Sequence, residues 1–441
     1  MNDSDLKSII RFTIPVALEH LLTQIIAMIV PALIGGISGS ALAAVGIVNQ
    51  TATMYTSVFA LMSTGGAVLL ARSIGSGDYR DSSRVVEQNI LMTVLASVLI
   101  ALGSLAATLP IMRLLMPTAE ARMFAEAVTY FRFIMLSLPP YLLYTVSAAM
   151  LRAVGNSRGP MMITAILNGV QVLSAFLFIR RLDMGIAGAG AAFVAARCVG
   201  AALALTMLFR QNRSFQVRIK RIFKPDFPTW MRIMRIGVPD SMQSTLLQAG
   251  YLVANSMIVG LGTHSATVYQ VVNTLYGFAA FPMGVCGPIL ISFVGRQLGA
   301  GDVPKAKRTL WRIYLAGMGA ELILSLVIVL NVGPLSRIYS SDPEVLRECR
   351  TIVWYMFGVC ISAMSINAMD PGLRTGGDGK CIMLYTAFGV WAVRVPLTWL
   401  LCYKLEMGVP GVYIANIVSL TFRALCSHVR FHTGKWLHKN I

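Results

Sequence analysis

Residues 71–84, ARSIGSGDYRDSSR, return 224 positions later as residues 295–308, GRQLGAGDVPKAKR. Both stretches carry Arg, Gly, Gly, Asp and Arg at the same relative positions. The matched pairs are Arg72 with Arg296, Gly75 with Gly299, Gly77 with Gly301, Asp78 with Asp302 and Arg84 with Arg308. An internal repeat of this kind predicts that the chain consists of two structurally equivalent halves.

The two Gly-x-Gly-Asp segments inside the repeat are predicted to be structural turns. Glycine reaches backbone angles closed to other residues, and an Asp side chain can cap the helix that follows. Intramembrane aspartyl proteases also contain this motif, but here it occurs twice, near arginines, and no Tyr-Asp pair precedes either copy. The predicted turn residues are Gly75, Gly77, Asp78, Gly299, Gly301 and Asp302.

The composition is that of an integral membrane protein. Hydrophobic residues make up 56% of the chain and charged residues 13%, and the mean hydropathy is +0.69. Apolar runs long enough to cross a bilayer recur twelve times without the alternation of a barrel strand, so they are predicted to be helices. The predicted spans are roughly 9–34, 41–70, 85–109, 125–150, 160–180, 186–209, 236–260, 265–295, 309–333, 348–372, 381–403 and 408–428.

A net charge of +18 raises the alternative of nucleic-acid binding, which the placement of the charges argues against. If the spans alternate from a cytoplasmic N-terminus, most of the 37 Lys and Arg fall in cytoplasmic segments. This is the positive-inside pattern. The N-terminus also lacks the features of a cleaved secretory signal. We therefore expect a multi-pass protein of the plasma (inner) membrane, with both termini cytoplasmic and no nucleic-acid partner.

The seven cysteines lie mostly in apolar runs and show no CxxC spacing. They are interpreted as packing residues, so no metal site and no disulfide framework are expected.

The repeat defines the domain organisation. Residues 1–209 are predicted to form an N-terminal six-helix lobe, 210–233 a basic cytoplasmic linker, and 234–441 a C-terminal six-helix lobe. Matches at an offset of 224 include Arg11 with Arg235, Pro15 with Pro239, Gln24 with Gln248 and Asn49 with Asn273; at 222, Arg152 matches Arg374. Six spans per half give both halves the same orientation, a parallel repeat typical of alternating-access transporters.

Four segments together resemble the multidrug and toxic compound extrusion (MATE) transporters, within the multidrug/oligosaccharidyl-lipid/polysaccharide flippase superfamily. They are IPVALEHLLTQ, repeated as VPDSMQSTLLQ; GRQLGAGDVPKAKR after span eight; LRAVGNSRGPMMITAILNGV; and GIAGAGAAFVA. The resemblance covers nearly the whole chain. It implies a V-shaped pair of six-helix lobes and efflux of organic solutes or drugs, coupled to inward movement of sodium ions or protons, with no other cofactor.

Two carboxylates within predicted spans are candidates for ion coupling, because ionisable groups in hydrocarbon are costly. Two similar bundles that face each other are expected to enclose a central cleft between the halves. Glu19 lies about one turn after Pro15, where it could exchange a proton with this cleft; the alternative is a carboxyl hydrogen-bonded to a neighbouring helix. Asp370 is the second candidate. A structural role is nevertheless favoured for Asp370, as it is for Glu321 and Asp240.

Candidate residues for the substrate cleft are polar or charged side chains within spans. They are Gln24, Asn49, Asn168, Gln248, Asn255, Asn273 and Arg394. The amides could instead join helices by hydrogen bonds. Arg394 is interpreted as facing the cleft, because it is too deep for easy snorkelling, whereas snorkelling or a headgroup contact is the alternative for Arg197.

The chain departs from the family where cation-binding carboxylates are usual. In place of those carboxylates it has Pro31 in span one, Val172 in span five and Ala363 in span ten, and the repeat partner of Val172 is Arg394. A cleft that has lost carboxylates and gained an arginine suits an anionic or zwitterionic solute better than a cationic drug.

We therefore predict a secondary active exporter of small organic solutes, a monomer in the bilayer, acting as a proton or sodium antiporter. The alternative is a flippase or exporter of an anionic or lipid-linked metabolite with atypical ion coupling. An enzyme is not expected, because no HExxH or paired catalytic Asp pattern occurs.

Overall fold

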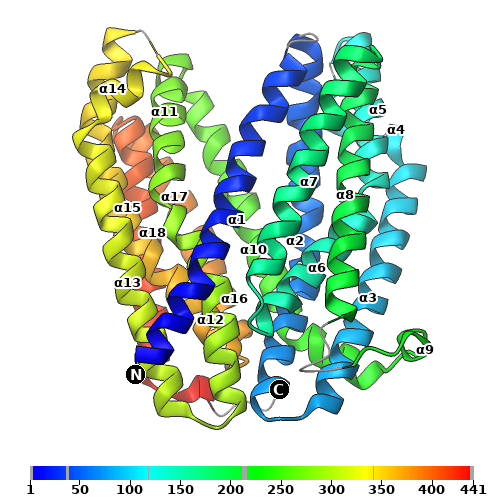
Figure 1. The fold of residues 1–441 in the computed structure, drawn as a ribbon. Coiled ribbons are helices and arrows are strands. Elements are labelled where there is room, and N and C mark those ends of the chain that lie inside the picture. Colours follow the sequence, from blue (N-terminus) through cyan, green and yellow to red (C-terminus); the bar gives the residue numbers. More distant parts are fainter. Residues whose placement is uncertain (1–2, 36–38, 118, 211–215, 341, 438–441) are drawn as a thin grey trace. The chain divides into compact units, whose positions relative to one another are not determined.

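The computed structural model describes residues 3–35, 39–117, 119–210, 216–340 and 342–437. Throughout these ranges the chain is helical, with short turns between the helices and no strand (Figure 1). Contacts divide it into two units, Met1–Gly237 and Val238–Ile441. The basic linker thus belongs to the first unit, together with the start of the seventh predicted span.

The first unit contains the first six predicted spans. Its helices are α1 (Asp3–Gly35), α2 (Gly39–Gly75), α3 (Tyr79–Ala106), α4 (Thr108–Leu115), α5 (Ala121–Leu136), α6 (Leu138–Ala153), α7 (Arg158–Phe176), the π-helical turn η1 (Leu177–Arg181), α8 (Gly185–Phe209) and α9 (Ile219–Ile222). Helix α1 packs against α7, and α8 packs against α6 and α7. These contacts surround the cavity described below.

The second unit repeats this arrangement. Its helices are most of α10 (Phe227–Gly260), α11 (Thr263–Ala279), α12 (Phe281–Gly299), α13 (Val303–Leu330), α14 (Val332–Arg337), α15 (Pro343–Thr375), α16 (Gly379–Ala387), η2 (Phe388–Arg394), α17 (Val395–Trp399), η3 (Leu400–Lys404), α18 (Val409–His432) and η4 (Lys435–Leu437). Helix α15 is central and packs against α11, α12, α13 and α18.

Length and hydropathy select ten membrane-spanning helices among the described residues, and an eleventh if the bent pair α5–α6, which turns by 44°, is one span. The predicted span 236–260 is also fully helical, within α10. Its hydropathy is lower because it carries Gln243, Gln248 and Asn255. The protein is therefore a multi-span α-helical membrane protein.

Unpaired prolines make the two units differ. The break between α5 and α6 precedes Pro139, whose repeat partner is Ile361 within the continuous α15. The break between α11 and α12 precedes Pro282, whose partner is Val58 within the continuous α2. Proline lacks the N–H that a continuous helix needs, so each break occurs only in the copy that carries it.

The two Gly-x-Gly-Asp segments form equivalent turns. Gly77 and Gly301 have φ of +76° and +77°, a left-handed conformation that favours glycine. The Asp78 carboxylate accepts a hydrogen bond from the Asp81 N–H at 2.9 Å, and that of Asp302 from the Lys305 N–H at 3.0 Å. Both aspartates thus cap the next helix, α3 or α13.

The first turns of α10 pack closely on α2. A Cβ on Gly237 would lie 2.1 Å from the Leu61 carbonyl oxygen, and one on Gly65 would lie 2.5 Å from that of Ile233. Leu61 lies one turn before Gly65, and Ile233 lies one turn before Gly237. Each helix therefore presents a glycine to the backbone of the other helix, and the two backbones are in contact. Small residues allow such contacts between membrane helices.

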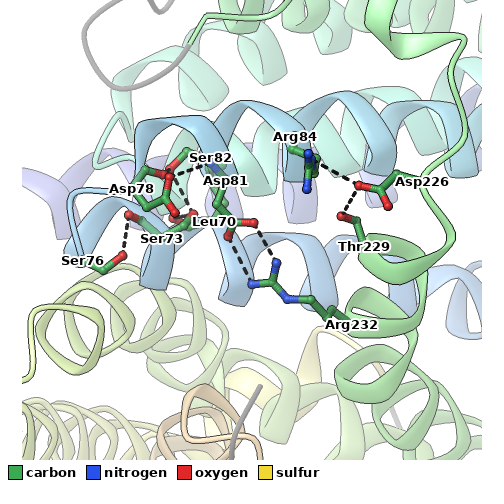
Figure 2. A network of polar contacts seen from close by, with 10 residues as sticks. All are labelled: Leu70, Ser73, Ser76, Asp78, Asp81, Ser82, Arg84, Asp226, Thr229 and Arg232. Carbon is green, nitrogen blue, oxygen red and sulfur yellow. Dashed lines mark hydrogen bonds and ion pairs between the residues drawn. The ribbon is translucent and has the colours of Figure 1, made fainter.

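Polar contacts fix the linker to α3 in the same unit (Figure 2). Arg232 donates two hydrogen bonds to Asp81, at 2.7 and 3.1 Å, and Arg84 pairs with Asp226 at 3.2 Å. Gln88 accepts from the Asp226 N–H and the Trp230 indole, at 2.9 and 2.8 Å. The linker is thus folded against the N-terminal unit.

Candidate functional site

The N-terminal unit contains a cavity of about 440 Å³ between α1, α2, α5, α6, α7 and α8. This volume lies within the range of small-molecule sites. Its wall combines apolar and aromatic side chains with many polar groups. The polar lining residues include Asn49, Thr53, Tyr141, Tyr144, Thr164, Asn168, Gln171 and Arg197.

Arg197 supplies the charge of this cavity. Its Nη1 donates to the Ser137 Oγ at 2.7 Å, and its guanidinium lies 4.2 Å from the centre of the Tyr141 ring and 4.5 Å from that of Phe193. No acidic residue in the described ranges forms an ion pair with it. The rings hold the cation by cation–π contact but leave its charge without a counter-ion.

Amides complete the polar wall. Asn49 and Asn168, both predicted for the cleft, line the cavity, and Asn168 donates to the Leu22 carbonyl at 3.2 Å. Gln171, three residues further along α7, was not among the predicted residues. An arginine beside amides and hydroxyls, with no carboxylate in the lining, can bind an anion and orient it.

Glu19 lies behind this wall. Its Oε1 accepts a hydrogen bond from Arg152 at 2.8 Å and one from Thr164 at 3.4 Å, and the Thr164 hydroxyl lies 2.6 Å from the Tyr144 hydroxyl. Thr164 and Tyr144 both line the cavity. The Glu19 carboxylate is therefore one hydrogen bond away from the space a solute would fill, and Arg152 neutralises it.

The second unit has an equivalent contact, in which the arginine binds a neutral glutamine in place of a glutamate. Gln243 holds the position of Glu19, and its Oε1 accepts a hydrogen bond from Arg374, the partner of Arg152, at 2.8 Å. The charge of Arg374 is balanced by Asp240 at 2.7 Å, where the first unit has Val16. The register of the repeat therefore extends to individual side-chain contacts.

Asp370 belongs to this second network. Tyr385 donates to its Oδ1, and Gln243 donates to its Oδ2 at 3.4 Å. The carboxylate lines a smaller cavity of about 200 Å³ in the C-terminal unit, together with Arg374 and Arg423. Because Asp240 pairs with Arg374, two carboxylates and two arginines balance here, unlike in the first unit.

Arg394 is buried in the second unit, at 3% exposure, with its guanidinium 4.4 Å from the centre of the Tyr251 ring. It ends the π-helical turn η2 and is not among the residues that line the 200 Å³ cavity, although Tyr251 is. Arg394 therefore contacts a ring that lines this cavity.

The remaining predicted residues lie outside both cavities. Gln24, Asn255 and Asn273 are exposed and Gln248 is partly buried, within the helices α1, α10 and α11. Glu321 is completely buried in α13, and neither carboxylate oxygen has a hydrogen-bond partner among the described residues. The side chain of Pro31 lies outside the described part of the chain.

Comparison with known proteins agrees with this architecture. The MatE family model matches residues 15–177 and again residues 239–400, once in each repeat. The probable multidrug resistance protein NorM of Thermotoga maritima is 24% identical, covering 98% of this chain and 93% of its own length. The uncharacterized transporter YisQ of Bacillus subtilis is 21% identical, covering 98% of this chain and 96% of its own length.

Solved structures show the same fold. A point mutant of the Vibrio cholerae MATE transporter VcmN superposes with a TM-score of 0.89 at 19% identity, covering 98% of both chains. A MOP superfamily transporter from Pyrococcus furiosus superposes with a TM-score of 0.87 at 19% identity, covering 98% of this chain and 97% of its own. That protein is described as having a binding pocket of reverse polarity that suggests a different function.

Fold and repeat define a membrane transporter built from two six-helix lobes. The chain belongs to the MatE family of multidrug efflux transporters.

Proposed function

We propose that the protein exports small organic anions or zwitterions with an aromatic or apolar portion, by alternating access and as an antiporter. The observation that supports this best is the cavity of the N-terminal unit, where Arg197 has no acidic partner among the described residues. Arg197 is partly buried, and a charge withdrawn from water is costly unless it is paired, so an anionic group is favoured beside it. The lining rings suit the rest of the solute.

For coupling, the proposal assigns proton or sodium exchange to Glu19. An anion bound beside Arg197 would share the wall residues Thr164 and Tyr144 with the Glu19–Arg152 pair. Solute binding could then change how tightly the carboxylate is held. Asp370 is the alternative, although Tyr385 and Gln243 already occupy its oxygens.

Transport by purified protein in proteoliposomes tests this function. Two solutes of similar size, an aromatic carboxylate and an aromatic quaternary ammonium, are offered under imposed proton or sodium gradients. We expect gradient-driven transport of the carboxylate that exceeds transport of the ammonium, and loss of the gradient dependence in Glu19→Gln. Preference for the ammonium would overturn the assignment of anionic solutes.

A lipid-linked anion would present the same head to Arg197 and would make the protein a flippase. The panel therefore includes the same carboxylate attached to a long acyl chain. Transport restricted to the acylated compound would favour the flippase over the exporter.

A further inference from the structure

A third pocket, of about 320 Å³, lies where α13 begins and α18 ends. It is lined by Lys307, Arg308, Trp311, Arg312, Phe431 and His432, and we refer to it as the α13–α18 pocket. It belongs to neither cavity described above. Its end of α13 follows the Gly-x-Gly-Asp turn, which the positive-inside pattern places on the cytoplasmic side.

The pocket has cations without acidic partners. Lys307, Arg308 and Arg312 form no ion pair with any residue in the part of the chain that the structure describes. Trp311 is 38% exposed, and its ring makes an edge contact with His428 at 6.3 Å. The surface at this end of α13 therefore combines three positive charges with an exposed apolar ring.

The internal repeat allows this surface of α13 to be compared with the equivalent surface of α3 in the first unit. At an offset of 224, Lys307, Arg308, Trp311 and Arg312 correspond to Ser83, Arg84, Glu87 and Gln88 on α3.

All four of these α3 residues contact the linker. Ser83 and Glu87 accept hydrogen bonds from the N–H groups of Gln216 and Arg218, at 3.1 and 2.7 Å. Arg84 pairs with Asp226, as Figure 2 shows, and Gln88 accepts from the N–H of Asp226. In the first unit this helix face is therefore a docking surface.

The same face has opposite chemistry in the two units. On α3 it includes the acidic Glu87 and receives a linker rich in cations; on α13 the equivalent position is Trp311, between Arg308 and Arg312. The chain has one such linker, already bound to α3, and its basic character would be repelled by α13. The ligand that fits the α13–α18 pocket is therefore acidic and comes from outside the chain.

We propose that the α13–α18 pocket binds the phosphate of an anionic phospholipid headgroup in the cytoplasmic leaflet. Pockets of clustered Lys and Arg at this membrane face recognise anionic headgroups, and Trp is favoured at the depth of the headgroups. Lys307 and Arg312 contact the phosphate, and the Trp311 ring lies along the upper acyl chain. The site shares no lining residue with the solute cavity, so this proposal and the proposed function are tested separately.

Lipid retention by delipidated protein in detergent tests the proposal. The protein is mixed with phosphatidylglycerol or phosphatidylcholine, and bound lipids are counted by native mass spectrometry over a concentration series. We expect the double variant Lys307→Gln/Arg312→Gln to need about 30-fold more phosphatidylglycerol for half-saturation of one site. Phosphatidylcholine retention should not change.

Two further variants serve as controls. Arg158→Gln/Lys380→Gln removes two exposed cations from other turns and should bind as the unmodified protein does. Lys307→Arg/Arg312→Lys keeps both charges and should retain the lipid. Equal retention by the Gln variant and the unmodified protein would overturn the proposal, and so would an equal loss in the Arg158/Lys380 control or no preference for phosphatidylglycerol.

Discussion

Arg197 shows how one residue changes the chemistry of a shared architecture. Its charge lies on the wall of the N-terminal cavity and is held by two rings and a hydroxyl, none of which neutralises it. No Asp or Glu is among the residues that line this cavity. The polarity of the cavity follows from this single imbalance.

Whether a cavity residue could be predicted from the sequence depended on whether its side chain could also reach another environment. Asn49 and Asn168 were predicted from their position within apolar spans, and both line the cavity. Arg197 was not selected, because an arginine in a run of small residues can also reach the headgroups. Its position is decided by Tyr141 and Phe193, which no local pattern reveals.

The Glu19–Arg152 pair gives a prediction at the same scale. Glu19→Gln should destabilise the protein by about 2 kcal/mol, because it leaves Arg152 without an acidic partner. This cost lies between that of breaking an exposed ion pair and that of breaking a buried one. The second unit offers the compensating change: Val16→Asp/Glu19→Gln recreates the Asp240, Gln243 and Arg374 arrangement and should recover part of the loss.

Thermal unfolding of the detergent-purified variants measures this effect. Val16→Asp alone serves as the control, since it adds a second acid beside an intact pair. A double variant that is no more stable than Glu19→Gln would show that the two networks are not equivalent.

At the scale of elements, two helix breaks differ between the units, and each precedes a proline. Pro139 and Pro282 each lack a repeat partner, and the breaks before α6 and α12 follow that difference. The helical spans themselves were predictable from apolar length. The docking of the linker was not, because Gln88 and Trp230 are 142 positions apart and meet only in the folded chain.

The contact between α2 and α10 predicts a strong effect of a small substitution. Gly237→Ala would place a methyl group 2.1 Å from a backbone oxygen, which cannot move as a side chain can. Overpacking of this kind costs about 1–3 kcal/mol. Gly46→Ala is the matched control, since nothing lies within 4 Å of its added Cβ, and it should be neutral or slightly stabilising. Thermal melting of both variants distinguishes them.

The linker contacts give a second prediction for an element. Asp81→Asn and Arg232→Gln should each increase proteolysis of the linker, and the double variant should cost less than the sum, because both remove one bidentate pair. A coupling of about 1 kcal/mol is expected for a partly exposed pair. Strictly additive effects in a thermal double-mutant cycle would show that the pair does not hold the linker.

The whole molecule is a duplication whose halves have diverged in charge. The turns, the capping aspartates and the arginine contacts of Gln243 and Glu19 are shared. The first cavity has an unbalanced cation, whereas at the second the carboxylates of Asp370 and Asp240 balance Arg374 and Arg423. The repeat was evident in the sequence and matched Arg152 with Arg374, but the contacts that these arginines make were not predicted from it.

The most direct test is the ratio of aromatic carboxylate to aromatic ammonium transported by Arg197→Gln proteoliposomes. The control is Arg132→Gln, which removes an exposed cation from α5, also in the N-terminal unit. A hydrogen-bonded charge is worth about 1.5–3 kcal/mol, so the account predicts that the ratio falls by about 10- to 100-fold in Arg197→Gln and stays unchanged in Arg132→Gln. An unchanged ratio in Arg197→Gln would contradict it.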